Sequence, residues 1–118
     1  MINAMQELLA MFKDEQTTCN VRCAVVGLRS SKTWDLDLQD IVDGQMCLRR
    51  AVLVENWDND QWCNFLQDLN FNYDNGYGTQ ELFGVVWFKD GSWLERDEYD
   101  GSEWWQLKKS PTLPERME

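Results

Sequence analysis

The stretch LFGVVWFKDGSWLERDEYDGSEWWQLK, residues 82–108, predicts a three-stranded antiparallel meander. Runs rich in β-branched and aromatic residues alternate there with Asp-Gly pairs at 90–91 and 100–101. Asp-Gly between such runs is among the strongest short hairpin signals, because a type I′ turn needs positive φ at both central residues. We therefore expect two tight hairpins in succession. Their strands are 82–88, 92–99 and 102–108.

Two-residue turns pair Phe88 with Trp93 in the first hairpin and Asp97 with Trp104 in the second. Because side chains alternate across a strand, this register sorts the meander into two faces. The expected core face, to be covered by helices, holds Phe83, Val85, Trp87, Leu94, Arg96, Trp105 and Leu107. The opposite face holds Leu82, Val86, Phe88, Trp93, Glu95, Asp97, Tyr99, Trp104 and Gln106.

Two details of this register concern charged side chains. On the core face, the guanidinium of Arg96 is expected to stack on the indole of Trp105. Glu98 and Glu103 become direct cross-strand neighbours, and like charges in such a pair are destabilising. Either Arg96 lies diagonally and relieves that repulsion, or the second turn is longer than two residues.

The end of the meander is a candidate partner-binding surface, because it combines large aromatic rings with carboxylates. Interfaces are enriched in aromatic anchors, and charge steers a protein towards an oppositely charged partner. The candidate residues are Trp93, Glu95, Asp97, Glu98, Tyr99, Asp100, Glu103 and Trp104. The alternative is that the acids form a solvated face and the tryptophans belong to the core.

Working outward from the meander, WDNDQW at 57–62 predicts the start of a helix over about 59–69. Asp58 is the expected N-cap, with Gln61 completing a capping box. Trp57 and Trp62 then occupy the two positions of a hydrophobic staple.

A second helix is predicted over about 3–14, with Asn3 as its N-cap, because Met5, Leu8, Leu9 and Phe12 recur at helical spacing. Valine-rich segments predict two strands, and alternation of apolar residues with aspartates predicts a short third one at Trp34–Leu38, followed by a turn at Asp43-Gly44. The two valine-rich segments are 20–28 and 46–54, and 70–79 is expected to be a loop. The chain is thus expected to be an α+β domain over 1–110 with a tail at 111–118.

The net charge of −10 is concentrated in one part of the sequence. Residues 55–103 hold twelve acids against only Lys89 and Arg96. Direct binding to nucleic acid is disfavoured, since that needs a basic surface. A basic protein partner is permitted by this field, although the same charge also serves solubility.

Catalysis and metal binding are disfavoured by residue type. The chain has no histidine, so nucleophilic catalysis lacks its usual base, and DEYDG does not match the spacing of a Ca²⁺ loop. The four cysteines lack CxxC spacing and are expected to be small buried hydrophobes with reduced thiols. We expect no enzymatic activity, no cofactor, no metal site and no membrane segment, and a cytoplasmic location.

Residues 72–105 resemble small acidic proteins encoded by bacteriophages and prophages, for which no activity is established. The resemblance covers roughly the C-terminal third of the chain and is carried by YDNGYGTQE and, more distinctively, by WLERDEYDGSEWW. It implies a product of a phage or mobile element acting in bacterial cytoplasm. Small acidic proteins of that origin include inhibitors of host defence, such as anti-CRISPR proteins and DNA mimics.

These observations lead to two functional hypotheses. The first is a non-enzymatic inhibitor that covers a basic, nucleic-acid-binding surface of a host protein, such as a CRISPR effector, with its acidic and aromatic face. The second is a phage structural or assembly protein that oligomerises through Trp93 and Trp104. The first expects a monomer or small homo-oligomer bound to a basic host protein.

Overall fold

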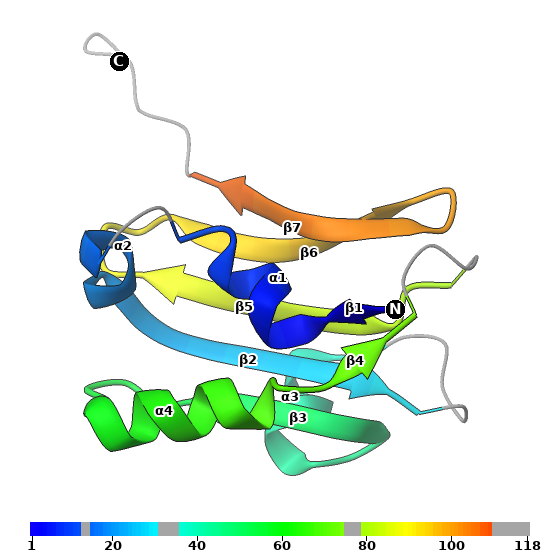
Figure 1. The fold of residues 1–118 in the computed structure, drawn as a ribbon, viewed down its shortest axis with the longest axis horizontal. Coiled ribbons are helices and arrows are strands. Elements are labelled where there is room, and N and C mark those ends of the chain that lie inside the picture. The colour runs from blue at the N-terminus through cyan, green and yellow to red at the C-terminus, as the bar shows by residue number, and fades with distance from the viewer. Residues whose placement is uncertain (13–14, 31–35, 75–78, 110–118) are drawn as a thin grey trace, which may run out of the picture.

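The computed structural model describes residues 1–12, 15–30, 36–74 and 79–109, and it is an α+β fold. Its main sheet is antiparallel, with five strands in the order β3-β2-β5-β6-β7 (Figure 1). The predicted meander is confirmed, with β5 at Leu82–Phe88, β6 at Trp93–Tyr99 and β7 at Ser102–Lys108. The predicted tail at 111–118 lies outside the described residues.

The two valine-rich strands extend this sheet on the β5 side. β2, Val21–Arg29, lies between β5 and β3, Cys47–Leu53, so both predicted strands are confirmed. Val25 pairs with Val85 on one side and Val52 on the other. The β2–β3 register shifts between Leu28 and Arg29, where β3 contains one extra residue. The extra residue is Leu48, and the exposed Arg49 and Arg50 next to it pair regularly with Leu28 and Gly27.

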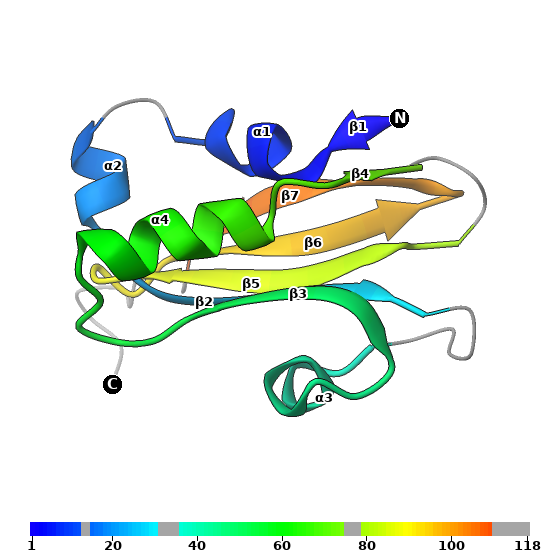
Figure 2. The ribbon, with the colours of Figure 1, turned by 60° about the horizontal axis from the view of Figure 1, so that its bottom comes forward.

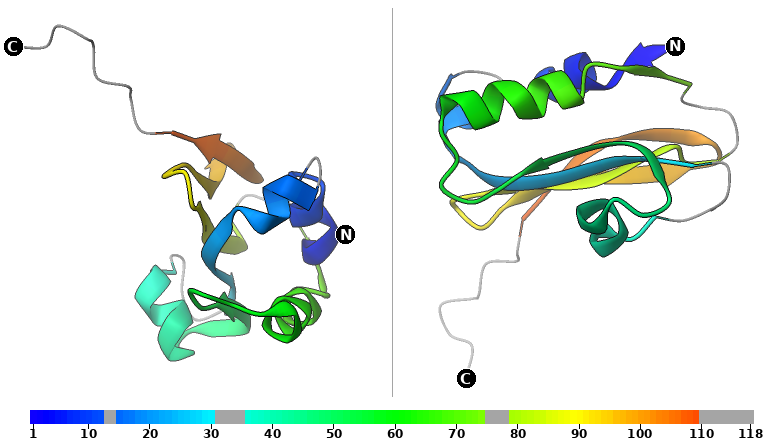
Figure 3. Two further views of the ribbon diagram at one scale, coloured as in Figure 1. Left: turned by 90° about the vertical axis from the view of Figure 1, so that its left-hand side faces the viewer. Right: turned by 90° about the horizontal axis from the view of Figure 1, so that it is seen from below.

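The helices lie on both faces of the sheet but cover them unequally. α1, Ala4–Leu9, α2, Glu15–Cys19, and α4, Asn59–Asp68, lie on one side, and α3, Leu38–Asp43, lies on the other (Figure 2). A small second sheet pairs β1, Ile2–Asn3, with β4, Asn72–Tyr73. α3 packs mainly on β2, β3 and β5, and the views from the side and from below show it away from β7 (Figure 3).

The start of α4 confirms the predicted local signals. The Asp58 side chain accepts the Gln61 N–H at 2.8 Å, and the Gln61 side chain accepts the Asp58 N–H at 2.9 Å. The rings of Trp57 and Trp62 stack with centroids 5.3 Å apart. Phe65 and Leu69, one turn apart, then enter the main core.

In the N-terminal half, the predicted helix is confirmed but shorter than expected, residues 13–14 lie outside the described residues, and the predicted third strand is wrong. The helix over 3–14 has the expected Asn3 cap but ends at Leu9, where Met11 and Phe12 make tighter hydrogen bonds to residues three back. Phe12 is thereby placed against the rings of Trp62 and Phe88. The described part of the predicted strand, 36–38, leads into α3 instead, and Trp34 lies outside the described residues. The predicted turn at Asp43-Gly44 lies at the end of α3, where Gly44 takes a φ of 74°.

The predicted register of the first hairpin is also wrong. Trp87 pairs with Trp93 and Val86 with Leu94, because the loop contains Lys89, Asp90 and Gly91 rather than two residues. Only Gly91 takes a positive φ, 92°, as in a three-residue hairpin. Asp90 holds the wider loop by accepting hydrogen bonds from the backbone N–H and hydroxyl of Ser92.

The extra loop residue exchanges the two faces of β5. Leu82, Val86 and Phe88 join Leu94 and Trp105 in the main core under α1 and α4, and Phe83 and Trp87 face α3 instead. The second hairpin has the predicted register, with Asp97 opposite Trp104 and Leu94 opposite Leu107. Its turn also has the expected geometry, since Asp100 and Gly101 have φ of 51° and 86°.

Candidate functional site

In the part of the chain that the structure describes, one face of the β6–β7 hairpin has no helix above it. Because Leu94, Arg96 and Trp105 point into the core under α1, the alternate residues of both strands point to the opposite side. We call this the open face: it consists of Trp93, Glu95, Asp97, Tyr99, Trp104, Gln106 and Lys108. Tyr99 is 76% exposed and Trp104 is 37% exposed, so the surface presents aromatic rings to solvent.

Lys108 is the residue on this face that the sequence analysis missed. Its Nζ lies 2.7 Å from Glu95 Oε2 and 3.0 Å from Asp97 Oδ1. The hydrogen bonds that Lys108 donates to Glu95 and to Asp97, in that order of importance, raise the pKa of Lys108 above its usual value. The predicted register of the second hairpin was sufficient to place Lys108 on this face. Pairing Leu94 with Leu107 puts Lys108 opposite Trp93 and diagonal to Glu95. Two of the predicted acids are therefore already paired within the protein.

Polar side chains on the open face also hold its indoles. Trp93 Nε1 donates to Glu95 Oε1, and Trp104 Nε1 donates to Gln106 Oε1, both at 3.3 Å. Each indole is thus tied to the residue two positions along its own strand. This restricts the ring orientation before any partner binds, and preorganisation lowers the entropic cost of binding.

The hairpin tip carries the charge that is not paired. Glu98, Tyr99 and Asp100 are all exposed, and within the described chain neither Glu98 nor Asp100 takes part in an ion pair. The tip thus holds two unneutralised carboxylates on either side of an exposed phenol. Of the eight predicted site residues, the structure gathers seven on the open face and this tip.

Glu103, the eighth, does not belong to the surface. Its side chain is 0% exposed, Oε1 lies 2.7 Å from Arg96 Nη2, and the backbone N–H groups of Glu81 and Leu82 donate to its two oxygens. Its cross-strand neighbour Glu98 is exposed. Of the two explanations for this acidic pair, the first is therefore correct: Arg96 lies diagonally and neutralises Glu103. Glu103 supports the fold beneath the tip.

Arg96 is the centre of a buried polar network. As predicted, its guanidinium stacks on Trp105, with Cζ 5.3 Å from the ring centroid. Nη2 also donates to Tyr73 Oη at 2.9 Å, and Nη1 lies 3.1 Å from Glu7 Oε1, a charge contact outside hydrogen-bond angles. Burial opposes the charged form, but Tyr73, Glu7 and Glu103 outweigh it and raise the pKa of Arg96.

Tyr73 should remain protonated well above the pH at which an exposed tyrosine ionises. Burial raises the pKa of Tyr73 most, Arg96 partly offsets this, and the hydrogen bond to Glu7 raises it further. Unfolded tyrosine ionises near pH ~10, so above that pH the unfolded chain binds fewer protons than the folded one. This contribution to stability is complete below about pH 10 and is lost as the pH rises further.

Phenolate absorbance during alkaline titration tests this expectation. Tyr73, whose phenol is buried, should ionise only as the protein unfolds. A Tyr73→Phe variant should lose the delayed step and the associated fall in stability. Ionisation of Tyr73 near pH ~10 in the folded protein would contradict the expectation.

The cysteines differ from their predicted environment. All four are free, but Cys19 and Cys63 are exposed and Cys23 and Cys47 are partly buried, so none is a fully buried hydrophobe. Within residues 1–12, 15–30, 36–74 and 79–109, no three of the Cys, Asp and Glu side chains are grouped as metal ligands. Over the same ranges, every helix is too short or too polar to cross a bilayer.

Comparisons with protein-family models, with curated proteins and with solved structures found no match to this chain.

Proposed function

We propose that this protein is a non-enzymatic binding protein that docks a basic surface of another protein onto the open face and the hairpin tip. The observation that carries the proposal is the exposure of Tyr99 and Trp104 on a hairpin whose tip holds Glu98 and Asp100, exposed carboxylates that form no ion pair among the described residues. Aromatic anchors of this kind dominate the binding energy of many interfaces, and surrounding charge steers the encounter.

The roles of the acids differ within this surface. Glu95 and Asp97 share Lys108, so this part of the open face carries a net charge of −1. It contributes shape and hydrogen-bonding groups to binding more than it contributes long-range electrostatic attraction. The long-range attraction for a basic partner comes from the hairpin tip and from the charge of −10 on the whole chain. Partner binding should therefore weaken as salt screens these charges.

The resemblance to phage-encoded proteins suggests which partner this would be. In that context, the protein is a phage-encoded inhibitor of a bacterial defence system, of the anti-CRISPR or DNA-mimic type. Its target is a basic, nucleic-acid-binding surface of a host protein, such as a CRISPR effector, in the bacterial cytoplasm. The carboxylates and exposed rings of the hairpin occupy that surface in place of phosphates and bases.

Two substitutions at the surface should weaken partner binding while the fold survives. Trp104→Ala should weaken binding about 30-fold, the size of an aromatic hot spot. Glu98→Lys should weaken it several-fold and reduce its salt dependence. The matched control is Asp68→Lys, which changes the net charge by the same amount at an exposed position near the end of α4.

The measurement is affinity for a partner captured from bacterial lysate at low salt, with each variant's thermal transition recorded in parallel. Equal losses for Glu98→Lys and Asp68→Lys would show that only net charge matters. Unchanged binding by Trp104→Ala with an intact thermal transition would refute a role for the open face.

The second candidate function is self-assembly, favoured by the position of β7 at the edge of the main sheet. An edge strand has unpaired backbone groups to which a second copy can add a strand, with Trp104 alongside. In this case the protein is a phage structural or assembly component. Light scattering distinguishes the two functions, because a stable monomer at high concentration argues against assembly.

A further inference from the structure

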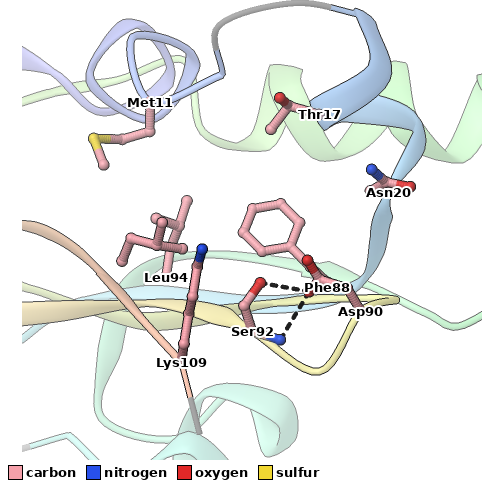
Figure 4. A pocket seen from close by; sticks show the side chains of 9 residues that line it. Met11, Thr17, Asn20, Phe88, Asp90, Ser92, Leu94 and Lys109 are labelled. Carbon is pink, nitrogen blue, oxygen red and sulfur yellow. Dashed lines mark hydrogen bonds between the residues drawn. The ribbon is translucent and has the colours of Figure 1, made fainter. Parts of the chain in front are cut away.

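A hollow of about 440 Å³ lies away from the open face, between α1, α2 and the ends of β5, β6 and β7 (Figure 4). Its size falls in the range of small-molecule sites, roughly 300–1,000 Å³. Its apolar wall is formed by Met11, Phe88, Leu94 and Leu107. Leu107 is 44% exposed although its cross-strand partner Leu94 is 2% exposed, so the helices leave part of this wall uncovered.

The hollow continues into a polar mouth. A second hollow of about 230 Å³ is lined by Asp90, Gly91, Ser92 and Lys109, and three of these residues also line the first. In the close-up view, the ammonium of Lys109 points into the space beside Leu94 and Ser92 (Figure 4). The space is therefore lined both by apolar side chains and by two opposite charges.

Both charges retain binding capacity. Asp90 Oδ1 accepts from the N–H and hydroxyl of Ser92, and within the described residues its other oxygen has no hydrogen-bond partner. These hydrogen bonds lower the pKa of Asp90, so it is charged at neutral pH. Lys109 has no carboxylate within 4.0 Å among the described residues, in contrast to its neighbour Lys108. Asp90 and Lys109 thus face one space without pairing to each other.

We propose that this hollow binds a zwitterionic amino acid with a bulky apolar side chain. The ligand's carboxylate pairs with Lys109, its ammonium pairs with the free oxygen of Asp90, and its side chain covers Leu94 and Leu107. A ligand with one charge would satisfy one of these groups and be repelled by the other. The site is independent of the open face and of any protein partner.

L-Phenylalanine is the probe, titrated into the full chain and followed by NMR shifts of the Ser92, Leu94 and Leu107 amides. Its expected dissociation constant is roughly millimolar, as suits a ligand of this size on an exposed site. L-Phenylalaninamide lacks the carboxylate and N-acetyl-L-phenylalanine lacks the ammonium, and each should bind about five-fold more weakly, the scale of one exposed ion pair. L-Alanine, with little apolar surface, should bind at least about ten-fold more weakly.

Two variants assign the charges independently. Lys109→Gln should weaken the binding of L-phenylalanine to that of L-phenylalaninamide, and it should not weaken the binding of the amide. Asp90→Asn keeps an oxygen for Ser92 and should remove the advantage of L-phenylalanine over the N-acetyl compound. Lys108→Gln, which removes the same charge one residue away, should leave all three constants unchanged.

Several results would overturn the proposal. One is that the NMR amide shifts do not saturate when the concentration of L-phenylalanine reaches roughly ten times the expected dissociation constant. Another is equal binding of the zwitterion and either analogue. A third is an equal effect of Lys108→Gln and Lys109→Gln, which would mean that the general field and not Lys109 attracts the carboxylate.

Discussion

Replacing Arg96 with methionine should lower the free energy of unfolding by about 4 kcal/mol, the usual cost of breaking a buried ion pair from one side. The side chain of Arg96 is 1% exposed, and its removal leaves Glu103 buried with no cation, while Glu7 loses its charge contact. Methionine restores some packing on Trp105 but supplies no donor. A domain of this size has roughly 5–15 kcal/mol of stability in total, so the loss is a large part of it.

Thermal and chemical denaturation measure this loss, which corresponds to a fall in Tm of roughly 15 °C. The control is Arg22→Met, the same substitution in a pair with Glu55 whose side chains are 58% and 54% exposed. Exposed pairs contribute little, so the control should change stability by less than about 1 kcal/mol. Similar results for the two variants would mean that the buried network adds nothing to stability.

Arg96→Lys separates the charge from the shape of the guanidinium. One ammonium cannot stack on Trp105 as a flat guanidinium does, nor reach Tyr73, Glu7 and Glu103 together. We expect a stability between those of the wild type and Arg96→Met. If Arg96→Lys were as stable as the wild type, a single ion pair would account for the whole contribution of the network to stability.

Features that depend on neighbouring residues could be predicted from the sequence. The capping box of α4 needs only residues three apart, and the strands of the meander are marked by composition and by Asp-Gly pairs. The register of the second hairpin followed from its turn, and with it the positions of Trp104 and Asp97. The position of Lys108 on the open face was predictable from the same register. Because Lys108 was left out of the prediction, the open face was expected to be more acidic than it is.

Features that depend on distant residues could not be predicted in the same way. The same dipeptide, Asp-Gly, forms two different turns here, because Asp90 bonds to Ser92 whereas Asp100 takes a positive φ. Alternating apolar and acidic residues before α3 imitate a strand, but Ile41 must cover Gly27 of β2, where an added Cβ would lie 2.7 Å from it. The partners of Arg96 come from α1, β4, β5 and β7, which no local pattern connects.

The acidic pair at Glu98 and Glu103 provides the other large expected effect. Glu103→Gln should lower the free energy of unfolding by about 3 kcal/mol, whereas Glu98→Gln should change it by less than about 0.5 kcal/mol. Both substitutions remove one charge from directly opposed residues of the same hairpin, so composition and position are matched. The difference arises from burial and from the partners of Glu103.

Glutamine cannot reproduce the contacts of Glu103, although it has the same shape. Oε1 accepts from Leu82 N–H at 3.0 Å and from Arg96 at 2.7 Å, while Oε2 accepts from Glu81 N–H at 2.8 Å. An amide has one accepting oxygen, so its NH₂ group must face a buried donor, and Arg96 loses its nearest counter-charge. Leaving one N–H unpaired costs about 1–3 kcal/mol before the lost charge is counted.

Denaturant unfolding of the two variants, together with their affinity for a captured partner, decides between a buried and a surface role for Glu103. With Glu103 beneath the tip, Glu103→Gln loses stability, and under conditions where it is fully folded it binds almost as well as the wild type. With Glu103 on the binding surface, as composition alone suggested, it would keep its stability and lose affinity like Glu98→Gln. The first outcome is expected because the Glu103 side chain is 0% exposed and its oxygens already accept from Arg96 and two backbone N–H groups, so a partner cannot reach it.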